Sequence, residues 1–146
     1  PRYQLTTGDN GQVASLIVQG KQFLSNEPTG GTRVPDGWGP RNFATTTLLG
    51  PHRLKSSDAT GSLEIAAREE SMDWILRNDR DKEIEFHIAL SPTVKVDFKD
   101  GIADLSRRDS RIQITGLDHA DVGETPELVA KVPAGSSVSL MIEVLK

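Results

Sequence analysis

Apolar residues at every second position between residues 61 and 98 constrain the fold of this chain more than any other feature. Period two is typical of a β-strand with one buried face, because successive side chains point to opposite sides of the sheet. A polar segment at 77–82, rich in Asn and Asp, predicts a turn between two of these strands. We therefore expect an antiparallel meander here. Its inward-facing residues are predicted to be Leu63, Ile65, Ala67, Met72, Trp74, Leu76, Ile84, Phe86, Ile88, Leu90, Val94, Val96 and Phe98.

Shorter segments of the same kind lie on both sides of the meander, and no segment favours a helix. Asp100-Gly101 predicts a two-residue hairpin turn, and 133–137 is expected to join the last two strands as a pair. The other expected strands are 3–7, 13–18, 23–24, 102–105, 112–115, 128–132 and 138–144. The segments 51–60 and 117–126 are predicted to be polar connections. The chain is therefore expected to be all-β, a single antiparallel β-sandwich domain over 1–146 with roughly nine to eleven short strands.

Composition excludes several functional classes. The 146 residues are enough for one domain with a core of its own, and the absence of cysteine excludes disulfides, thiolate metal sites and cysteine nucleophiles. A net charge of -4 argues against a nucleic-acid partner. No apolar run approaches the roughly 20 residues that a membrane-spanning helix needs, so no membrane partner is expected. Because the chain begins at Pro1, we expect it to be cut from a longer protein.

A long Gly/Pro-rich loop at 25–51 is the strongest candidate for a binding site. It carries Trp38 between glycines and prolines, and an indole held on a stiff loop suits stacking on the apolar face of a sugar ring. Arg33, Asp36, Arg41 and Asn42 would orient sugar hydroxyls or a uronate carboxylate. The alternatives are that the loop is a mobile connection between two sheets, or that its aromatic residues close the end of the sandwich.

Other polar residues are weaker candidates. Trp74 is in phase with the apolar face and is expected in the core. Glu85 and His87 are expected on the solvent face, where they would be surface decoration or a proton-transfer pair. Asp118, Asp121 and Glu124, with His119 among them, suggest either a solvated acidic loop or a calcium site. Lys99, Arg107, Arg108 and Arg111 offer the positive charge that a uronate lyase needs, but no base can be placed beside them.

Three segments, at 11–24, 74–86 and 132–144, resemble galactose-mutarotase-like sandwich domains, which include parts of polysaccharide lyases such as rhamnogalacturonan lyases. No histidine and glutamate set of this chain aligns with the mutarotase catalytic residues. The resemblance therefore implies a non-catalytic carbohydrate-binding or accessory module of a polysaccharide-degrading system, which would be secreted or periplasmic. Its partner would be a polysaccharide or oligosaccharide. The alternatives are a small lyase or sugar epimerase that uses a loop base and an arginine, and a structural spacer or interaction module.

Overall fold

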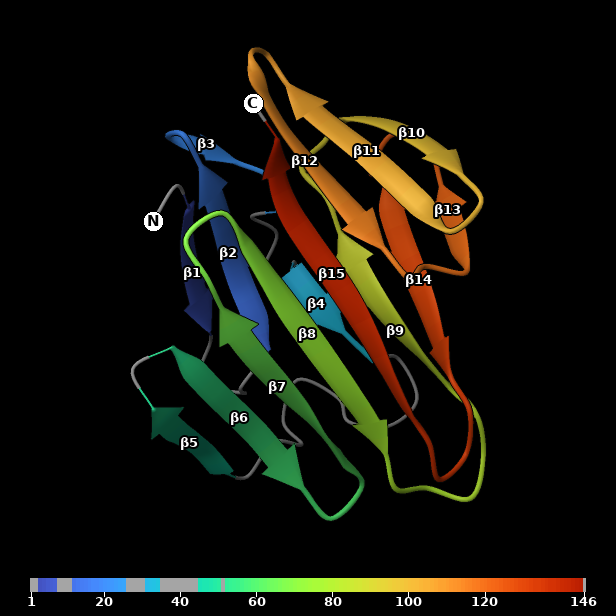
Figure 1. Ribbon diagram of the computed structural model, residues 1–146. Helices are drawn as coiled ribbons and strands as arrows, with labels where there is room; N and C mark the ends of the chain where they lie inside the picture. Colours follow the sequence, from blue (N-terminus) through green and yellow to red (C-terminus); the bar gives the residue numbers. More distant parts are fainter. Residues whose placement is uncertain (1–2, 8–11, 26–30, 35–44, 51, 146) are drawn as a thin grey trace.

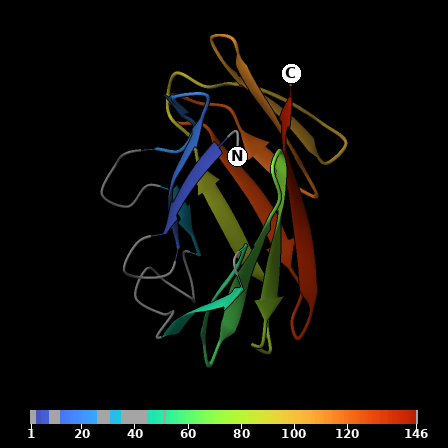
Figure 2. The same ribbon diagram turned by 60° about the vertical axis from the view of Figure 1, so that its left-hand side comes forward.

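The protein is a two-layer antiparallel β-sandwich (Figures 1 and 2). Its computed structural model describes residues 3–7, 12–25, 31–34, 45–50 and 52–145. The strands are β1 (Tyr3–Thr7), β2 (Val13–Val18), β3 (Lys21–Gln22), β4 (Gly31–Arg33), β5 (Thr45–Gly50), β6 (Arg53–Asp58), β7 (Gly61–Ala67), β8 (Ser71–Asn78), β9 (Ile84–Ala89), β10 (Lys95–Lys99), β11 (Ile102–Arg107), β12 (Ser110–Thr115), β13 (His119–Asp121), β14 (Glu127–Val132) and β15 (Ser137–Leu145). The predicted fold class is confirmed.

A large sheet forms one layer and two smaller sheets form the other. The large sheet has the order β10-β11-β12-β15-β8-β7-β6-β5, and the smaller ones have the orders β13-β14-β9-β4 and β1-β2-β3. The core lies between the layers and takes apolar residues from all three sheets. Trp74 of the large sheet is fully buried and meets Phe86 of the small sheet edge to face, with ring centroids 6.4 Å apart. The prediction that Trp74 belongs to the core is therefore confirmed.

The predicted meander is wrong at the turn that follows β8. Strand β8 pairs with β7 and β15, whereas β9 lies in the other layer between β14 and β4. The next strand, β10, lies in the large sheet beside β11, so the expected pairing after β9 is wrong as well. The expected pairing of the last two strands is wrong for the same reason, because β14 and β15 belong to different sheets. In a sandwich, strands in opposite layers bury their apolar faces in one core. Alternation alone therefore does not distinguish a hairpin from a crossover between layers.

The buried side chain of Asn78 joins two of the connections that cross between the layers, from β8 to β9 and from β14 to β15. Its Nδ2 donates to the carbonyl oxygens of Lys82, at 2.8 Å, and Val132, at 3.0 Å. Its Oδ1 accepts the backbone N–H of Arg80 at 2.9 Å. The side-chain amide of Asn78 thus forms hydrogen bonds with backbone groups of both connections. A turn between two paired strands would not need a side chain for this purpose.

Local turn chemistry was easier to predict. Asp100 and Gly101 have positive φ angles of 52° and 81° and join β10 to β11, which confirms the predicted two-residue hairpin. A similar turn at Gln19 and Gly20 joins β2 to β3. The described strands outnumber the nine to eleven expected, in part because the segments predicted as polar connections contain β6 and β13. The segment predicted as one long loop, 25–51, likewise contains β4 and β5.

Candidate binding site

The β13-β14-β9-β4 sheet presents a polar face on the side away from the core. Along β9 the apolar residues point inward, which leaves Glu85 and His87 on the outer face. Strand β14 alternates in the same way and places Glu127, Val129 and Lys131 outward. The strand register then aligns four residues in one row across the sheet: Arg33, His87, Val129 and His119. The sequence-predicted position of Glu85 and His87 on the outer face is observed.

A hydrogen-bonded chain of charged side chains crosses this face from β4 to β14 and back to β9. The guanidinium of Arg33 donates to both carboxylate oxygens of Glu127, at 3.2 and 3.1 Å. Glu127 also contacts Nδ1 of His87, whose Nε2 lies 3.1 Å from Glu85. The His87 side chain is only 14% exposed. This arrangement holds the imidazole rigidly between two carboxylates, and both contacts are hydrogen bonds only when both ring nitrogens carry hydrogen.

The hydrogen-bond partners of Glu127 favour its ionised form. Burial raises the pKa of this carboxyl, but the hydrogen bonds from His87 and Arg33 and the charge of Arg33 outweigh that effect. The pKa of Glu127 is therefore lower than usual. Glu127 therefore stays ionised to lower pH than an isolated glutamate.

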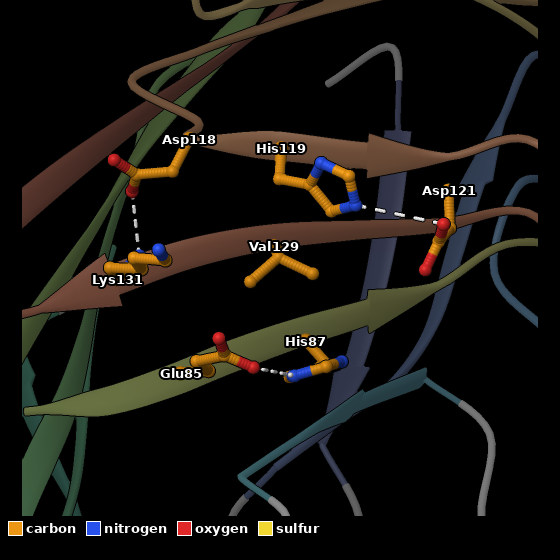
Figure 3. Close-up of a pocket in the computed structure, with 7 residues that line it drawn as sticks. All are labelled: Glu85, His87, Asp118, His119, Asp121, Val129 and Lys131. Atoms are coloured by element: carbon orange, nitrogen blue, oxygen red, sulfur yellow. Dashed lines mark hydrogen bonds and ion pairs between the residues drawn. The ribbon is translucent and has the colours of Figure 1, made fainter.

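A pocket of about 500 Å³ opens beside these hydrogen-bonded side chains (Figure 3). We name it the histidine pocket, and its lining residues are Glu85, His87, Asp118, His119, Asp121, Val129 and Lys131. Nε2 of His119 lies 3.6 Å from Asp121 at one side. At the other side a carboxylate oxygen of Asp118 accepts the backbone N–H of Lys131 at 2.6 Å. Carboxylates therefore outnumber the single lysine along this lining, and Val129 is its apolar member.

The structure relates only part of the predicted loop site to this pocket. Trp38, Asp36, Arg41 and Asn42 lie outside the described residues. Arg33 is described: it is the last residue of β4, pairs in register with His87 and is engaged by Glu127.

The residues proposed for calcium are only partly brought together. Asp118 and Asp121 line the histidine pocket, whereas Glu124 is not among the lining residues that the structure describes. In the described part of the chain, no group of three or more His, Cys, Asp or Glu side chains is arranged to hold a metal ion. Calcium at this loop stays a prediction from the sequence.

The arginines considered for a lyase clamp have other contacts. Arg107 donates to the carbonyl of Gln22 at 2.5 Å and so ties the β1-β2-β3 sheet to the large sheet. Arg108 lies in a turn with a φ of 56°, and Arg111 is 4.0 Å from Asp104.

Sequence reasoning missed Glu127 and Lys131. Both belong to β14, where the apolar residues Leu128, Ala130 and Val132 point to the core. The same alternation that predicted this strand therefore places Glu127 and Lys131 on the outer face. Their approach to β9 could not be predicted, because it depends on β9 pairing with β14 across 40 residues of sequence between His87 and Glu127.

Comparisons with known proteins show the fold and no family. No protein-family model matches this chain, and neither does any curated protein. Five solved chains match, and one of them is a protein named as a polysaccharide lyase. It aligns with 99% of this chain at a TM-score of 0.56 and 10% sequence identity. The chain spans 32% of the length of that lyase. The fold is therefore similar to part of a polysaccharide lyase.

The described residues contain no helix of the length and apolarity needed to cross a membrane.

Proposed function

We propose that this chain is a non-catalytic β-sandwich module that binds polysaccharide or oligosaccharide as an accessory part of a polysaccharide-degrading system. The observation that carries the proposal is the similarity of nearly the whole chain to one third of a polysaccharide lyase. That similarity concerns the fold alone, so the choice of ligand rests on the chemistry of the outer face described above. We further propose that the protein is secreted or periplasmic, where such polymers occur, and that its sandwich is of the galactose-mutarotase-like kind.

The histidine pocket offers the two kinds of polar group that sugar hydroxyls need. The carboxylates of Glu85 and Asp121 accept hydrogen bonds, and the ammonium of Lys131 donates them. The imidazole of His119 adds a further polar group to this lining. Because His87 and Glu85 already hold each other, the ordering cost of binding is reduced. An open pocket of about 500 Å³ suits one or two sugar units of a longer chain.

The Gly/Pro-rich loop is the second element of the proposed site. Residues 31–33 of this 25–51 segment form β4, which ends at Arg33 beside His87. We propose that Trp38 stacks on a sugar ring while Asp36, Arg41 and Asn42 bind its hydroxyls. The guanidinium of Arg33 is held by Glu127, so we assign it to positioning His87 as well as to ligand contact.

The contacts of the two ring nitrogens of His87 favour a binding function over a lyase reaction. A lyase needs a base that can take a proton from a substrate carbon. Nδ1 of His87 contacts Glu127 and Nε2 faces Glu85, which leaves neither nitrogen free for that role.

Calorimetric titration with neutral and acidic plant and algal polysaccharides tests this proposal. Saturable heat is expected with at least one polymer, together with a change in tryptophan fluorescence. The chain has two tryptophans and Trp74 is fully buried, so that change would report on Trp38. Lys131→Ala should weaken binding, whereas Lys95→Ala on β10 removes the same charge outside the pocket and should not. Absence of heat with every polymer would contradict the proposal.

A further inference from the structure

A second pocket lies where the β1-β2-β3 sheet meets the large sheet. It has a volume of about 430 Å³ and is lined by Tyr3, His52, Ala67, Arg68 and Glu69. We propose that this tyrosine pocket is a separate subsite for one uncharged saccharide ring. The identity of the ligand rests on the proposed carbohydrate function, but the pocket itself does not depend on the histidine pocket.

Three distant parts of the chain build the tyrosine pocket and are fastened to each other. The Tyr3 hydroxyl on β1 lies 2.5 Å from the carbonyl oxygen of Arg68 and 3.0 Å from that of Ser71, so it holds β1 against the β7–β8 turn (Figure 1). The backbone N–H of Ala67 donates to the carbonyl of His52 at 2.8 Å and fixes the start of β6 against the end of β7. The pocket is therefore formed before a ligand arrives, which reduces the entropic cost of binding.

The guanidinium of Arg68 is held in place while part of it stays available. Its Nε donates to the hydroxyl of Ser71 at 3.0 Å, and its Nη1 donates to Asp73 at 2.9 Å. Among the described residues no protein partner is assigned to Nη2. Since the side chain is already ordered by two contacts, a further hydrogen bond to a ligand hydroxyl costs less conformational entropy than one from a free arginine.

The surface of the pocket matches the two surfaces of a sugar ring. Tyr3, which is 7% exposed, and Ala67 provide an apolar floor for the C–H face of the ring. Arg68 and His52 can donate to hydroxyls at its edge, and Glu69 can accept from them. The charge of Arg68 is balanced by Asp73 and accompanied by that of Glu69, so the pocket lacks the excess positive charge that would select a uronate.

Glu69 gives the cleanest test, because it is exposed and its removal should leave the fold intact. The experiment measures the affinity of the full chain for neutral oligosaccharides and for uronate oligosaccharides of the same length. Glu69→Ala should weaken binding of the neutral ligand about two- to tenfold, the loss expected for one hydrogen bond. Glu83→Ala, an exposed glutamate outside both pockets, should leave the affinity unchanged.

Amide NMR shifts give a second readout. In the wild type, the neutral ligand should shift the signals of residues 67–69, and Glu69→Ala should reduce those shifts. Unchanged affinity and unchanged shifts in Glu69→Ala would overturn the subsite while leaving the proposed function intact. Tighter binding of the uronate ligand at residues 67–69 would also overturn it. If the wild type bound no saccharide at all, both proposals would fail together.

Discussion

The histidine pocket and the tyrosine pocket are built in opposite ways. The first is assembled by side chains of neighbouring strands in register, and its polar groups largely contact one another. The second is assembled by turns and strand ends from three parts of the chain, and it keeps an apolar floor under a polar rim. Polar groups that already contact one another favour selectivity, because a ligand must match each of them. An apolar floor adds affinity instead, because ligand binding removes water from it. The two pockets should therefore respond differently to substitution, pH and ligand charge.

The largest difference is expected in stability. Tyr3→Ala removes a buried ring and the hydroxyl that joins β1 to the β7–β8 turn, so the free energy of unfolding should fall by about 3 kcal/mol. Lys131→Ala in the histidine pocket removes an exposed side chain and should change it by less than about 0.5 kcal/mol. Urea denaturation of both variants measures the difference. Equal losses would show that the tyrosine pocket is not anchored by Tyr3.

On the outer face of β9 and β14, beside the histidine pocket, Glu127 is the residue on which stability should depend most. Glu127→Gln keeps the size of the side chain but removes the charge that Arg33 and His87 share. The unfolding free energy should fall by about 1–2 kcal/mol, since these groups are partly exposed to water. Glu69 in the tyrosine pocket has no such partners within the described part of the chain, so Glu69→Gln should change the unfolding free energy little. An unchanged unfolding free energy in Glu127→Gln would mean that the contacts of Glu127 with Arg33 and His87 do not stabilise the fold.

The stabilisation from Glu127 should also depend on pH. Because the folded-state pKa of this carboxyl is lowered, its contribution is fully present above the ordinary value of 4.5 and is lost as the pH falls through the lowered value. The difference in unfolding free energy between wild type and Glu127→Gln should therefore shrink in acid. Denaturation curves between neutral pH and about pH 3 would show this convergence. A difference that grew in acid would contradict the assigned direction.

The smallest effect concerns ligand charge. Asp121→Asn removes one of the carboxylates that outnumber Lys131 in the histidine pocket, so binding of uronate oligosaccharides there should improve by about twofold. The improvement should disappear at high salt, because the side chain of Asp121 is 78% exposed and its charge is screened. Calorimetry at two salt concentrations measures it. Improvement of a neutral ligand by the same factor would point to a cause other than charge.

The strands could be predicted from the sequence because their signals are local. Alternation along 71–76 predicts a half-buried strand, and Asp-Gly at 100–101 predicts the turn between β10 and β11 from the preference for positive φ. The layer to which each strand belongs could not be predicted. Asn78 shows why: only its position under two crossovers distinguishes it from any polar residue at the end of a hairpin.

The candidate sites were predictable only in part, for the same reason. His87 and Glu85 were expected on a solvent face, and they lie there. Glu127 reaches His87 through a pairing of β9 with β14, and Arg68 meets Tyr3 across 65 residues of sequence. Contacts of this kind depend on topology, which alternation does not encode.

Mapping of a bound oligosaccharide onto the protein tests the account most directly. The measurement is a titration of isotope-labelled protein, followed through backbone amide signals, with the neutral oligosaccharide that gives the largest heat. The account predicts that the shifted signals fall into two groups, one in the 25–51 segment and on β9, β13 and β14 around His87, Val129 and Lys131, and one at 67–69. Saturable binding that shifted neither group, with all changes on the outer face of β10, β11 and β12, would contradict it.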